Sequence, residues 1–327
     1  MKKIGGRILL GSLLSIFILI GYIVWDNNRI TVTEEDIAID DMPEELDGFR
    51  ILQVSDLQEK EFGNNQKRLI GAINDIDYDA IVFTGDILDN TESTNYKSFY
   101  SILDGITDKE NAWFVSGNDD PYSYQFAPSI EKSEFIKGME QRGVELLESV
   151  ETVKLEEANI HFVNFELSII SSSEYVGTSE GIVTPPYNSN ENYLTYQKQL
   201  WQDMKVLDNV DEADVVIALN HYPVADNRID FIHTNDKTIW RDYDLIMAGH
   251  YHGGQFRLPF VGALFVPEPW HKSSFFPSND RVKGLWEYKQ TKQYVSAGLG
   301  SSDALSFFKF RMFNPPEINL LTLKRIR

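Results

Sequence analysis

The sequence contains no cysteine, which excludes disulfide bonds and any metal site built from thiolates. Basic residues are also scarce. The chain has 30 lysines and arginines against 50 aspartates and glutamates, which gives a formal net charge of -20. This charge opposes nonspecific binding to nucleic acid, which depends on cationic side chains. An anionic substrate is still allowed, because bound cations reverse the local field.

The rest of the composition is that of a globular protein. Of 327 residues, 42% are hydrophobic and 24% are charged, which is enough for a large core in one large domain or two modest ones. The chain shows no internal repeat and no linker long enough to separate two domains. We therefore expect one folded domain over residues 47–327.

The N-terminal region carries an uncharged apolar run over residues 8–25, about 18 residues and near the minimum that spans a bilayer as a helix. Lys2, Lys3 and Arg7 precede the run and acidic residues follow it. The positive-inside tendency therefore predicts a cytoplasmic tail over residues 1–7, a transmembrane anchor over 8–25 and an exported remainder.

We expect a single-pass protein of the cell membrane with its domain outside the cell, joined by a polar stalk over residues 26–46 with a first strand at 30–32. The alternative is a cleaved signal peptide. The bulky residues 22–25 lack the small-x-small pattern of a cleavage site, which favours the anchor.

Short apolar runs alternate with helical periodicities through the first half of the domain. From residue 144 apolar and polar residues alternate as is typical of antiparallel strands. A long surface loop is expected at 171–190, and buried strands follow it. The expected strands are 49–54, 80–83, 112–115, 152–155, 160–165, 215–219, 244–247, 294–298 and 318–323. The expected helices are 65–76, 96–103, 130–141 and 194–207. This order predicts an α/β protein.

Five of the predicted strands end in residue types that bind metals. These are Asp56, Asp86, Asn118, His221, and His250 with His252. In extended geometry the two histidines point to the same side. Ligands of α/β sheets gather at the carboxyl ends of strands, and oxygen and imidazole donors suit Mn, Fe or Zn. One such residue could be a turn or cap residue, but five in succession predict a metal site.

The ordered motifs resemble those of the calcineurin-like metallophosphoesterases, namely Asp-x-His, Gly-Asp-x-x-Asp, Gly-Asn-His-Asp/Glu, His before Pro, and Gly-His-x-His. In this chain they are Asp56-Leu57-Gln58, Gly85-Asp86-Ile87-Leu88-Asp89, Gly117-Asn118-Asp119-Asp120, His221-Tyr222-Pro223 and Gly249-His250-Tyr251-His252. The resemblance extends from about residue 49 to the C-terminus, and residues 253–259 are similar to the bacterial membrane-associated branch. It implies a four-layer α-β-β-α sandwich.

The resemblance also implies a binuclear centre in which Asp86 bridges two divalent metal ions. Asp56, Gln58 and His252 would hold the first ion, and Asn118, His221 and His250 the second. A hydroxide between the ions then attacks phosphorus in line. We expect manganese, with iron, zinc or magnesium as alternatives.

The resemblance assigns roles to further residues. Asp86, Asp119 and His221 are the expected catalytic residues, and Asn118, Asp119, Gly253 and Arg257 the expected substrate-binding ones. Asp89 is expected to orient a turn or a group behind the metal ligands rather than to bind metal itself. The expected reaction is hydrolysis of a diester or pyrophosphate, in a substrate that is lipid-linked or amphiphilic, and a nuclease role is disfavoured by the acidic charge.

Two positions depart from the family pattern, because Gln58 and Asp119 stand where the family has histidines. An amide oxygen is a weaker and harder ligand than imidazole, which shifts the metal preference towards Mn or Mg. An ionised Asp119 repels phosphate. We therefore expect slower catalysis, and the alternative function is a catalytically weak or inactive scaffold or sensor.

The segment 256–276 holds five aromatic residues, at 260, 265, 270, 275 and 276. It is either a flap packed on the core or an apolar wall beside the metals that meets lipid or an amphiphilic substrate. Of the remaining histidines, we expect His161 to be a packed core residue, His233 to lie at the surface, and His271 to lie in an exposed loop.

Overall fold

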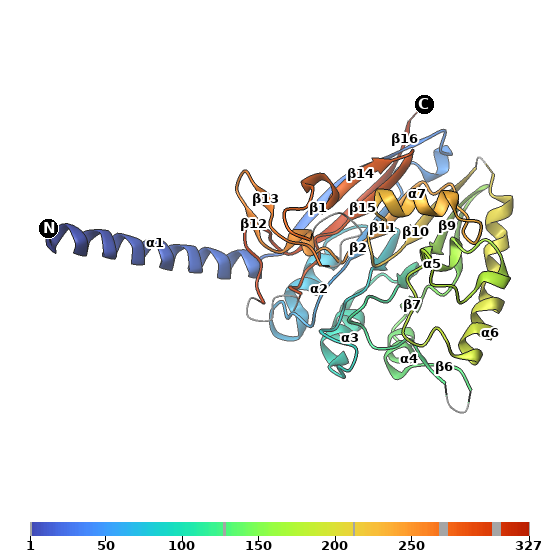
Figure 1. Ribbon diagram of the computed structural model, residues 1–327, viewed down its shortest axis with the longest axis horizontal. Helices are drawn as coiled ribbons and strands as arrows, with labels where there is room; N and C mark the ends of the chain where they lie inside the picture. The colour runs from blue at the N-terminus through green and yellow to red at the C-terminus, as the bar shows by residue number, and fades with distance from the viewer. Residues whose placement is uncertain (1, 127–128, 212, 268–273, 303–308, 327) are drawn as a thin grey trace.

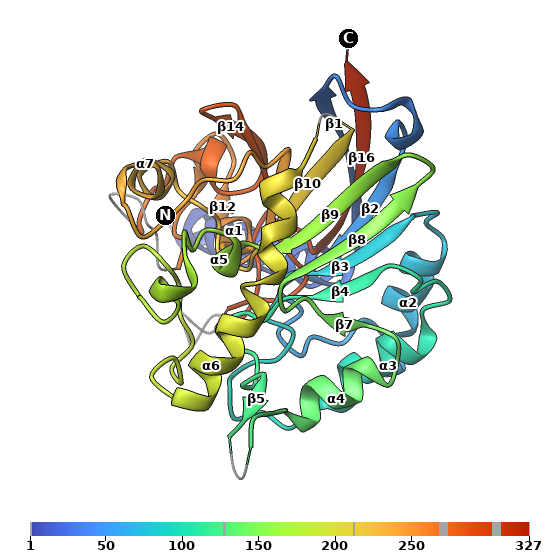
Figure 2. The same cartoon turned by 90° about the vertical axis from the view of Figure 1, so that its right-hand side faces the viewer.

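The computed structural model describes residues 2–126, 129–211, 213–267, 274–302 and 309–326, and two six-stranded mixed sheets form its centre (Figure 1 and Figure 2). The first sheet has the order β1 (Thr31–Asp40), β16 (Glu317–Ile326), β2 (Arg50–Val54), β3 (Ala80–Phe83), β4 (Ala112–Phe114) and β7 (Glu145–Leu146). The second has the order β14 (Gly284–Tyr288), β15 (Thr291–Val295), β11 (Leu245–Ala248), β10 (Asp214–Leu219), β9 (Ala158–Asn164) and β8 (Val150–Leu155).

Helices cover the outer face of each sheet. The first sheet packs against α2 (Lys67–Asn74), α3 (Tyr96–Gly105) and α4 (Glu134–Glu140). The second packs against α5 (Phe165–Ser168), α6 (Glu191–Leu200), η4 (Asp203–Asn209) and α7 (Asp226–Thr234). The predicted α-β-β-α sandwich is thus confirmed.

The other elements are an N-terminal helix, two small hairpins and short turns of 3-10 helix. They are α1 (Lys2–Asn28), β5 (Tyr124–Gln125) with β6 (Glu131–Lys132), β12 (Arg257–Leu258) with β13 (Gly262–Ala263), η1 (Glu44–Leu46), η2 (Asn64–Gln66), η3 (Ser173–Tyr175), η5 (His252–Gly254) and η6 (Asn279–Arg281).

The core between the sheets follows from the two-residue period of the strands. In β3, Ile81 and Phe83 belong to the core beneath the helices, whereas Val82 belongs to the core shared with the second sheet. There the rings of Trp113 and Phe162, one from each sheet, lie 4.5 Å apart. Both faces of these strands are buried, which is why they are near-continuous apolar runs in the sequence.

The predicted stalk over residues 26–46 is wrong, because most of it belongs to the domain. β1 pairs in parallel with β16 from Thr31 opposite Glu317 to Asp40 opposite Ile326. Ile37 and Ile39 are buried between the sheets. The acidic residues before them indicated a polar stalk. They instead belong to β1, an edge strand whose alternate side chains face solvent.

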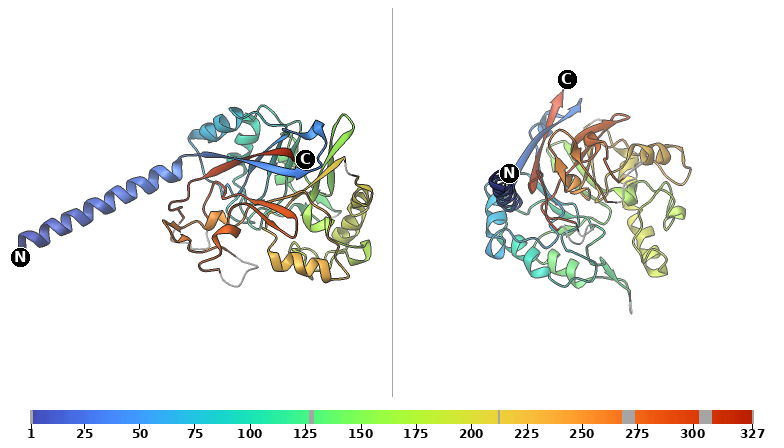
Figure 3. Two further views of the ribbon diagram at one scale, coloured as in Figure 1. Left: turned by 90° about the horizontal axis from the view of Figure 1, so that it is seen from above. Right: turned by 60° about the vertical axis from the view of Figure 1, so that its left-hand side comes forward.

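The helix α1 projects away from the domain (Figure 1 and Figure 3). Its segment Arg7–Asn28 has a mean hydropathy of 2.4 and an unburied apolar stretch, so it is long and apolar enough to cross a membrane. Its C-terminal end is fixed to the domain. Asn27 Nδ2 donates to the carbonyl oxygen of Arg311 (2.6 Å), and the backbone N–H of Arg311 donates to Asn27 Oδ1 (2.7 Å).

Replacing Phe162 with alanine tests the core between the two sheets. The variant loses a buried ring and its contact with Trp113, so its free energy of unfolding should fall by about 3–5 kcal/mol. Denaturant titration of the full chain in detergent, followed by tryptophan fluorescence, measures the loss. The exposed Val206→Ala is the control and should change stability by less than about 0.5 kcal/mol. Equal stability of the two variants would contradict a shared core.

Candidate metal centre

The loops that follow β2, β3, β10 and β11 bring the predicted metal ligands into two overlapping groups. Ligand atoms of Asp86, His221 and His250 lie within 4.8 Å of one another, and those of Asp56, Asp86 and His252 do the same. All five side chains are buried. Asp86 belongs to both groups, which is the geometry expected of a bridging carboxylate.

The donors in these groups fit a divalent cation. His250 Nε2 and Gln58 Oε1 are buried and find no hydrogen-bond partner in the described part of the chain. An unpaired buried polar atom is costly, so a cation bound by either atom stabilises the site. His221 Nδ1 lies 2.8 Å from the carbonyl oxygen of Thr84, which leaves the Nε2 lone pair facing the cluster. Imidazole and carboxylate together suit Mn, Fe or Zn.

The backbone reaches this arrangement through an unusual conformation. Asp56, Asp86, His250 and His252 have φ values of 50°, 53°, 69° and 47°. The left-handed region costs energy for residues other than glycine and clusters at functional sites. Such turns direct each ligand inwards immediately after its strand, and the sequence alone shows no sign of them.

Two glycines of the motifs let the ligand loops approach each other. A Cβ on Gly249 would lie 2.1 Å from Ser55 Oγ and 2.4 Å from Asp56 Oδ2. A Cβ on Gly117 would lie 2.2 Å from Asp86 Oδ1. Hydrogen is therefore the only substituent that fits at either position without moving a ligand.

Asp120 is a functional residue to which the sequence analysis assigned no role. Its Oδ2 accepts the backbone N–H groups of Asp86 and Gly117, both at 2.8 Å, and its Oδ1 accepts that of Ile87 at 2.8 Å. Burial, with the nearby charge of Asp86, raises the pKa of Asp120 to about 6. Its place as the last residue of the Gly117 motif was the available signal. It positions the loop that carries Asp86.

Burial and close charges determine the ionisation of the cluster. Burial disfavours charge on both Asp86 and His221, but their attraction prevails: the pKa of Asp86 falls to about 2 and that of His221 rises to about 10. Burial lowers the pKa of His252 to about 3 and that of His250 well below its ordinary value. Those two imidazoles are therefore neutral, whereas a cation bound by His221 must displace a proton.

The two residues that depart from the family pattern contact each other. Gln58 Nε2 donates to Asp119 Oδ2 (3.0 Å) and to Asp86 Oδ2 (3.1 Å). The backbone N–H of Asp119 in turn donates to Asp86 Oδ1 (2.8 Å). Burial, with repulsion from Asp86, raises the pKa of Asp119 to about 6. The Gln58 amide thus joins the two carboxylates, and it binds a cation only through its opposite, oxygen side.

The predicted substrate-binding residues lie in two places. Asn118 is exposed, and its Oδ1 lies 3.1 Å from His221 Nε2, so it belongs to the cluster. Gly253 follows His252 directly in η5. The Arg257 guanidinium donates to the carbonyl oxygen of Gly253 (2.9 Å) and to Asn279 Oδ1 (3.3 Å). Arg257 is therefore bound within the loop that follows the histidines.

The other predicted residues take structural positions. Asp89 forms an ion pair with Lys309 at 2.5 Å. His161 is buried and its Nδ1 lies 2.9 Å from the Thr152 hydroxyl, as expected of a core histidine. His233 is exposed at the surface. His271 lies outside the described residues, as does the aromatic residue at 270.

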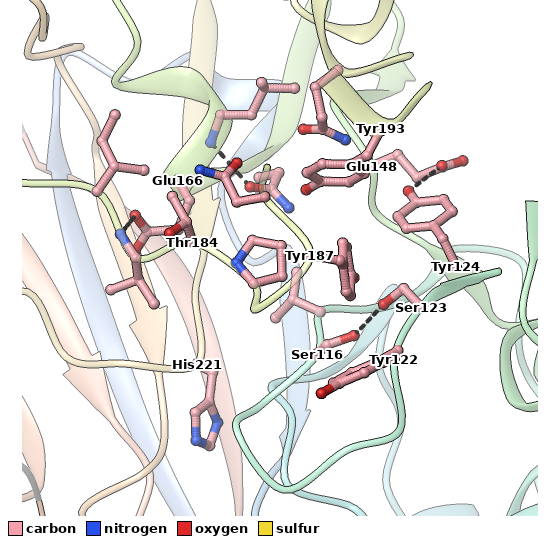
Figure 4. A pocket seen from close by; sticks show the side chains of 18 of the residues that line it. Ser116, Tyr122, Ser123, Tyr124, Glu148, Glu166, Thr184, Tyr187, Tyr193 and His221 are labelled. Carbon is pink, nitrogen blue, oxygen red and sulfur yellow. Dashed lines mark hydrogen bonds between the residues drawn. The ribbon is translucent and has the colours of Figure 1, made fainter. Parts of the chain in front are cut away.

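A cavity of about 390 Å³ adjoins the cluster on the side of Asn118 and His221 (Figure 4). Its wall includes residues 182–188, so the predicted surface loop 171–190 in part encloses a pocket. The tyrosines that line it are Tyr122, Tyr124, Tyr187, Tyr193 and Tyr222.

Two acidic side chains of this wall are paired with neighbours. Glu148 accepts the hydroxyls of Tyr124 (2.5 Å) and Tyr196 (2.8 Å). Glu166 forms an ion pair with Arg228 at 2.6 Å. The cavity therefore presents tyrosine rings and neutral polar groups beside the metal ligands, rather than free carboxylates.

Comparison with known proteins identifies several relatives. The sequence profile of calcineurin-like phosphoesterases matches residues 49–254. The uncharacterised metallophosphoesterase YkuE of Bacillus subtilis is 27% identical over 306 residues, which cover 91% of this chain and 86% of YkuE. The UDP-2,3-diacylglucosamine pyrophosphatase LpxG of Chlamydia muridarum is 24% identical over 324 residues, which cover 91% and 92%. Among solved structures, phosphopantetheinyl hydrolase PptH from Mycobacterium tuberculosis overlaps with a TM-score of 0.42 at 12% identity, covering 78% of this chain and 91% of PptH.

Replacing Gly249 with alanine tests the close approach of the ligand loops. The added methyl displaces Asp56, so the affinity for Mn²⁺ should fall by at least about tenfold. Isothermal titration of the full chain in detergent measures it. Gly71→Ala is the matched control, because its Cβ in α2 meets nothing within 4 Å and should leave the affinity unchanged. Wild-type affinity in Gly249→Ala would show that Asp56 is not a ligand.

Proposed function

The chain belongs to the calcineurin-like phosphoesterase family, and from this premise we propose that it hydrolyses phosphoesters at the membrane surface with two divalent cations. The observation that carries the proposal is the position of Asp86, which is shared by two groups of buried ligand atoms.

The residues divide between the two proposed ions as follows. Asp56 and His252, with the oxygen of Gln58, hold one ion, and His221 and His250, with Asn118, hold the other. When bound, the ions supply Lewis acidity towards water and towards the phosphate oxygens. We propose manganese, because the Gln58 amide oxygen makes the first site rich in hard oxygen donors.

Two side chains are proposed to act on the substrate directly: one orients the phosphate, and the other donates a proton to the leaving oxygen. Asn118 is exposed at the cavity beside His221, where its amide is placed to bind a phosphate oxygen. Asp119 lies next to the bridging carboxylate, and its raised pKa lets its protonated form donate to the leaving oxygen. Gly253 and Arg257, which are hydrogen-bonded to each other in the segment after His252, are the proposed substrate contacts on that side.

The substrate and location follow from three further observations. The tyrosine-lined cavity offers about 390 Å³ for the organic group of a phosphoester. The similarity to LpxG, a UDP-2,3-diacylglucosamine pyrophosphatase by name, supports a lipid-linked diester or pyrophosphate. The apolar α1 after Lys2, Lys3 and Arg7 supports a single-pass anchor with the domain outside the cell.

Replacing metal ligands tests the proposal. Asp86→Asn and His250→Ala should each lower kcat/KM for bis(p-nitrophenyl) phosphate by at least ~100-fold, more than the loss from a group that only supports a ligand. The assay uses the full chain in detergent with Mn²⁺. His233→Ala is the matched control, because it removes an exposed imidazole and should retain the wild-type rate.

The outcomes separate the proposal from its alternative. Retained activity in His250→Ala would overturn the ligand assignment. A wild-type chain that binds Mn²⁺ but hydrolyses no phosphoester would instead support the scaffold or sensor function, which the contact between Gln58 and Asp119 favours.

Restoring histidine at position 58 tests the weakened first site. In Gln58→His an imidazole replaces the amide that now binds Asp86 and Asp119, so the Mn²⁺ concentration for half-maximal activity should fall roughly tenfold. The double variant Gln58→His/Asp119→His should be faster than either single variant. In each single variant the new histidine still faces the residue that departs from the family pattern, and the double variant replaces both. An unchanged metal requirement in Gln58→His would show that position 58 does not bind the ion.

A further inference from the structure

We propose that the loop following the metal ligands inserts into the membrane that α1 crosses, so that the metal centre acts on phosphoesters of lipids in that membrane. The inserting surface, here called the apolar edge, consists of Leu258, Phe260 and Val261 on the β12–β13 hairpin with Phe275 and Phe276 beside it. The inference rests on the proposed membrane anchor and adds a second contact with lipid.

The side chains of the apolar edge are exposed to a degree that a soluble surface rarely tolerates. Phe260 is 108% exposed, Phe276 70% and Phe275 63%. Outside α1, the described residues include ten exposed large hydrophobic side chains, of which the apolar edge supplies five. The other five are scattered: Val32, Tyr122, Val206, Phe313 and Ile326.

The base of this segment is packed although its tip is exposed. Ala263 and Val266 are buried in a cluster with Trp286, as a flap packed on the core requires. The tip projects beyond them. Both interpretations of the aromatic segment therefore apply, each to a different part of it.

Hydrogen bonds hold the hairpin in a defined shape. Asn279 Oδ1 accepts the backbone N–H of Ala263 (2.8 Å), and Asn279 Nδ2 donates to the carbonyl oxygen of Val261 (2.9 Å). The backbone N–H of Phe276 donates to the carbonyl oxygen of Leu264 (2.9 Å), which places it beside the hairpin. The rings are thus presented by ordered backbone.

The apolar edge lies beside the end of α1. Asn27 of α1 binds Arg311, and the adjacent Met312 exchanges backbone hydrogen bonds with the hairpin's entrance, accepting from Arg257 (2.9 Å) and donating to Gln255 (3.1 Å). Two views show the hairpin on the side from which α1 projects (Figure 1 and Figure 3). A bilayer that receives α1 is therefore next to the apolar edge.

Aromatic rings join α1 to Phe313, which follows Met312 in the chain. The ring of Tyr22 lies 5.3 Å from that of Phe313 and 5.9 Å from that of Trp25. Tyrosine and tryptophan are enriched where a membrane protein crosses the interface with water. The net charge of -20 opposes attraction to anionic lipid, so the insertion depends on apolar side chains.

The apolar edge is directly connected to the metal ligands. His252 is joined to the hairpin through Gly253 and Gly254, and it lines a small depression together with Phe256 and Phe265. His221 and Asn118 line the tyrosine cavity instead. In the proposed arrangement a lipid phosphoester approaches the metal centre from the side of the apolar edge and His252.

The absence of cysteine makes site-specific labelling straightforward. The full chain is reconstituted in phosphatidylcholine vesicles after Phe260→Cys or Phe276→Cys and nitroxide labelling. Accessibility to oxygen should exceed accessibility to a water-soluble nickel chelate by severalfold at both positions. Leu14→Cys in α1 is the control for lipid exposure, and Val206→Cys in η4 is the control for water exposure.

Each outcome decides the inference. If the labels at 260 and 276 resemble the label at 206 while the label at 14 is in lipid, the anchor stands and the apolar edge does not insert. If the label at 14 is also in water, the proposed anchor and the inference fail together. The labels report insertion whether or not the chain turns over a phosphoester.

Hydrolysis rates on two substrates test whether the apolar edge is needed for activity on lipid phosphoesters. Phe260→Ser/Phe276→Ser should hydrolyse a diacylglycerol p-nitrophenyl phosphodiester in vesicles at least fivefold more slowly than wild type, yet retain the rate on bis(p-nitrophenyl) phosphate. Val206→Ser is the control and should change neither rate. An equal loss on both substrates, or no loss on either, would overturn the assignment of the apolar edge to lipid substrates.

Discussion

The close approach of the loops around Asp86 is the constraint on which the rest of the site depends. Gly117 lies against the Asp86 carboxylate and Gly249 against that of Asp56, at distances that exclude a methyl group. Asp120 fixes the first contact by accepting backbone N–H groups from both loops. The ligands are therefore positioned by backbone that is itself held by several contacts, which allows Asp56, Asp86, His250 and His252 to keep a left-handed conformation.

Local patterns predicted much of this fold and site. Buried parallel strands are short apolar runs, and their carboxyl ends meet at one edge, so Asp56, Asp86, His221 and His250 could be grouped from sequence. The contacts between segments far apart in the sequence could not be predicted in this way. The acidic start of β1 resembles a stalk until its pairing with β16 is known. The segment 171–190 has a loop composition, and only its packing shows that it encloses a cavity.

The contact between Gln58 and Asp119 changes the meaning of both departures from the family pattern. Taken singly, each weakens a metallophosphoesterase site. Together they form a hydrogen-bonded pair in which Gln58 donates to the carboxylates of both Asp119 and Asp86. The polar atoms around Asp86 are thus largely paired, while His250 Nε2 is buried with no hydrogen-bond partner among the described residues.

The order of strands in the first sheet also constrains how the protein is made. β16 lies between β1 and β2, so the final strand must enter between the two earliest ones. When β1 leaves the ribosome its sole neighbour, β16, has yet to be synthesised, and the loop that must close is nearly as long as the chain. The domain can therefore complete its sheet only after residues 317–326 have been synthesised.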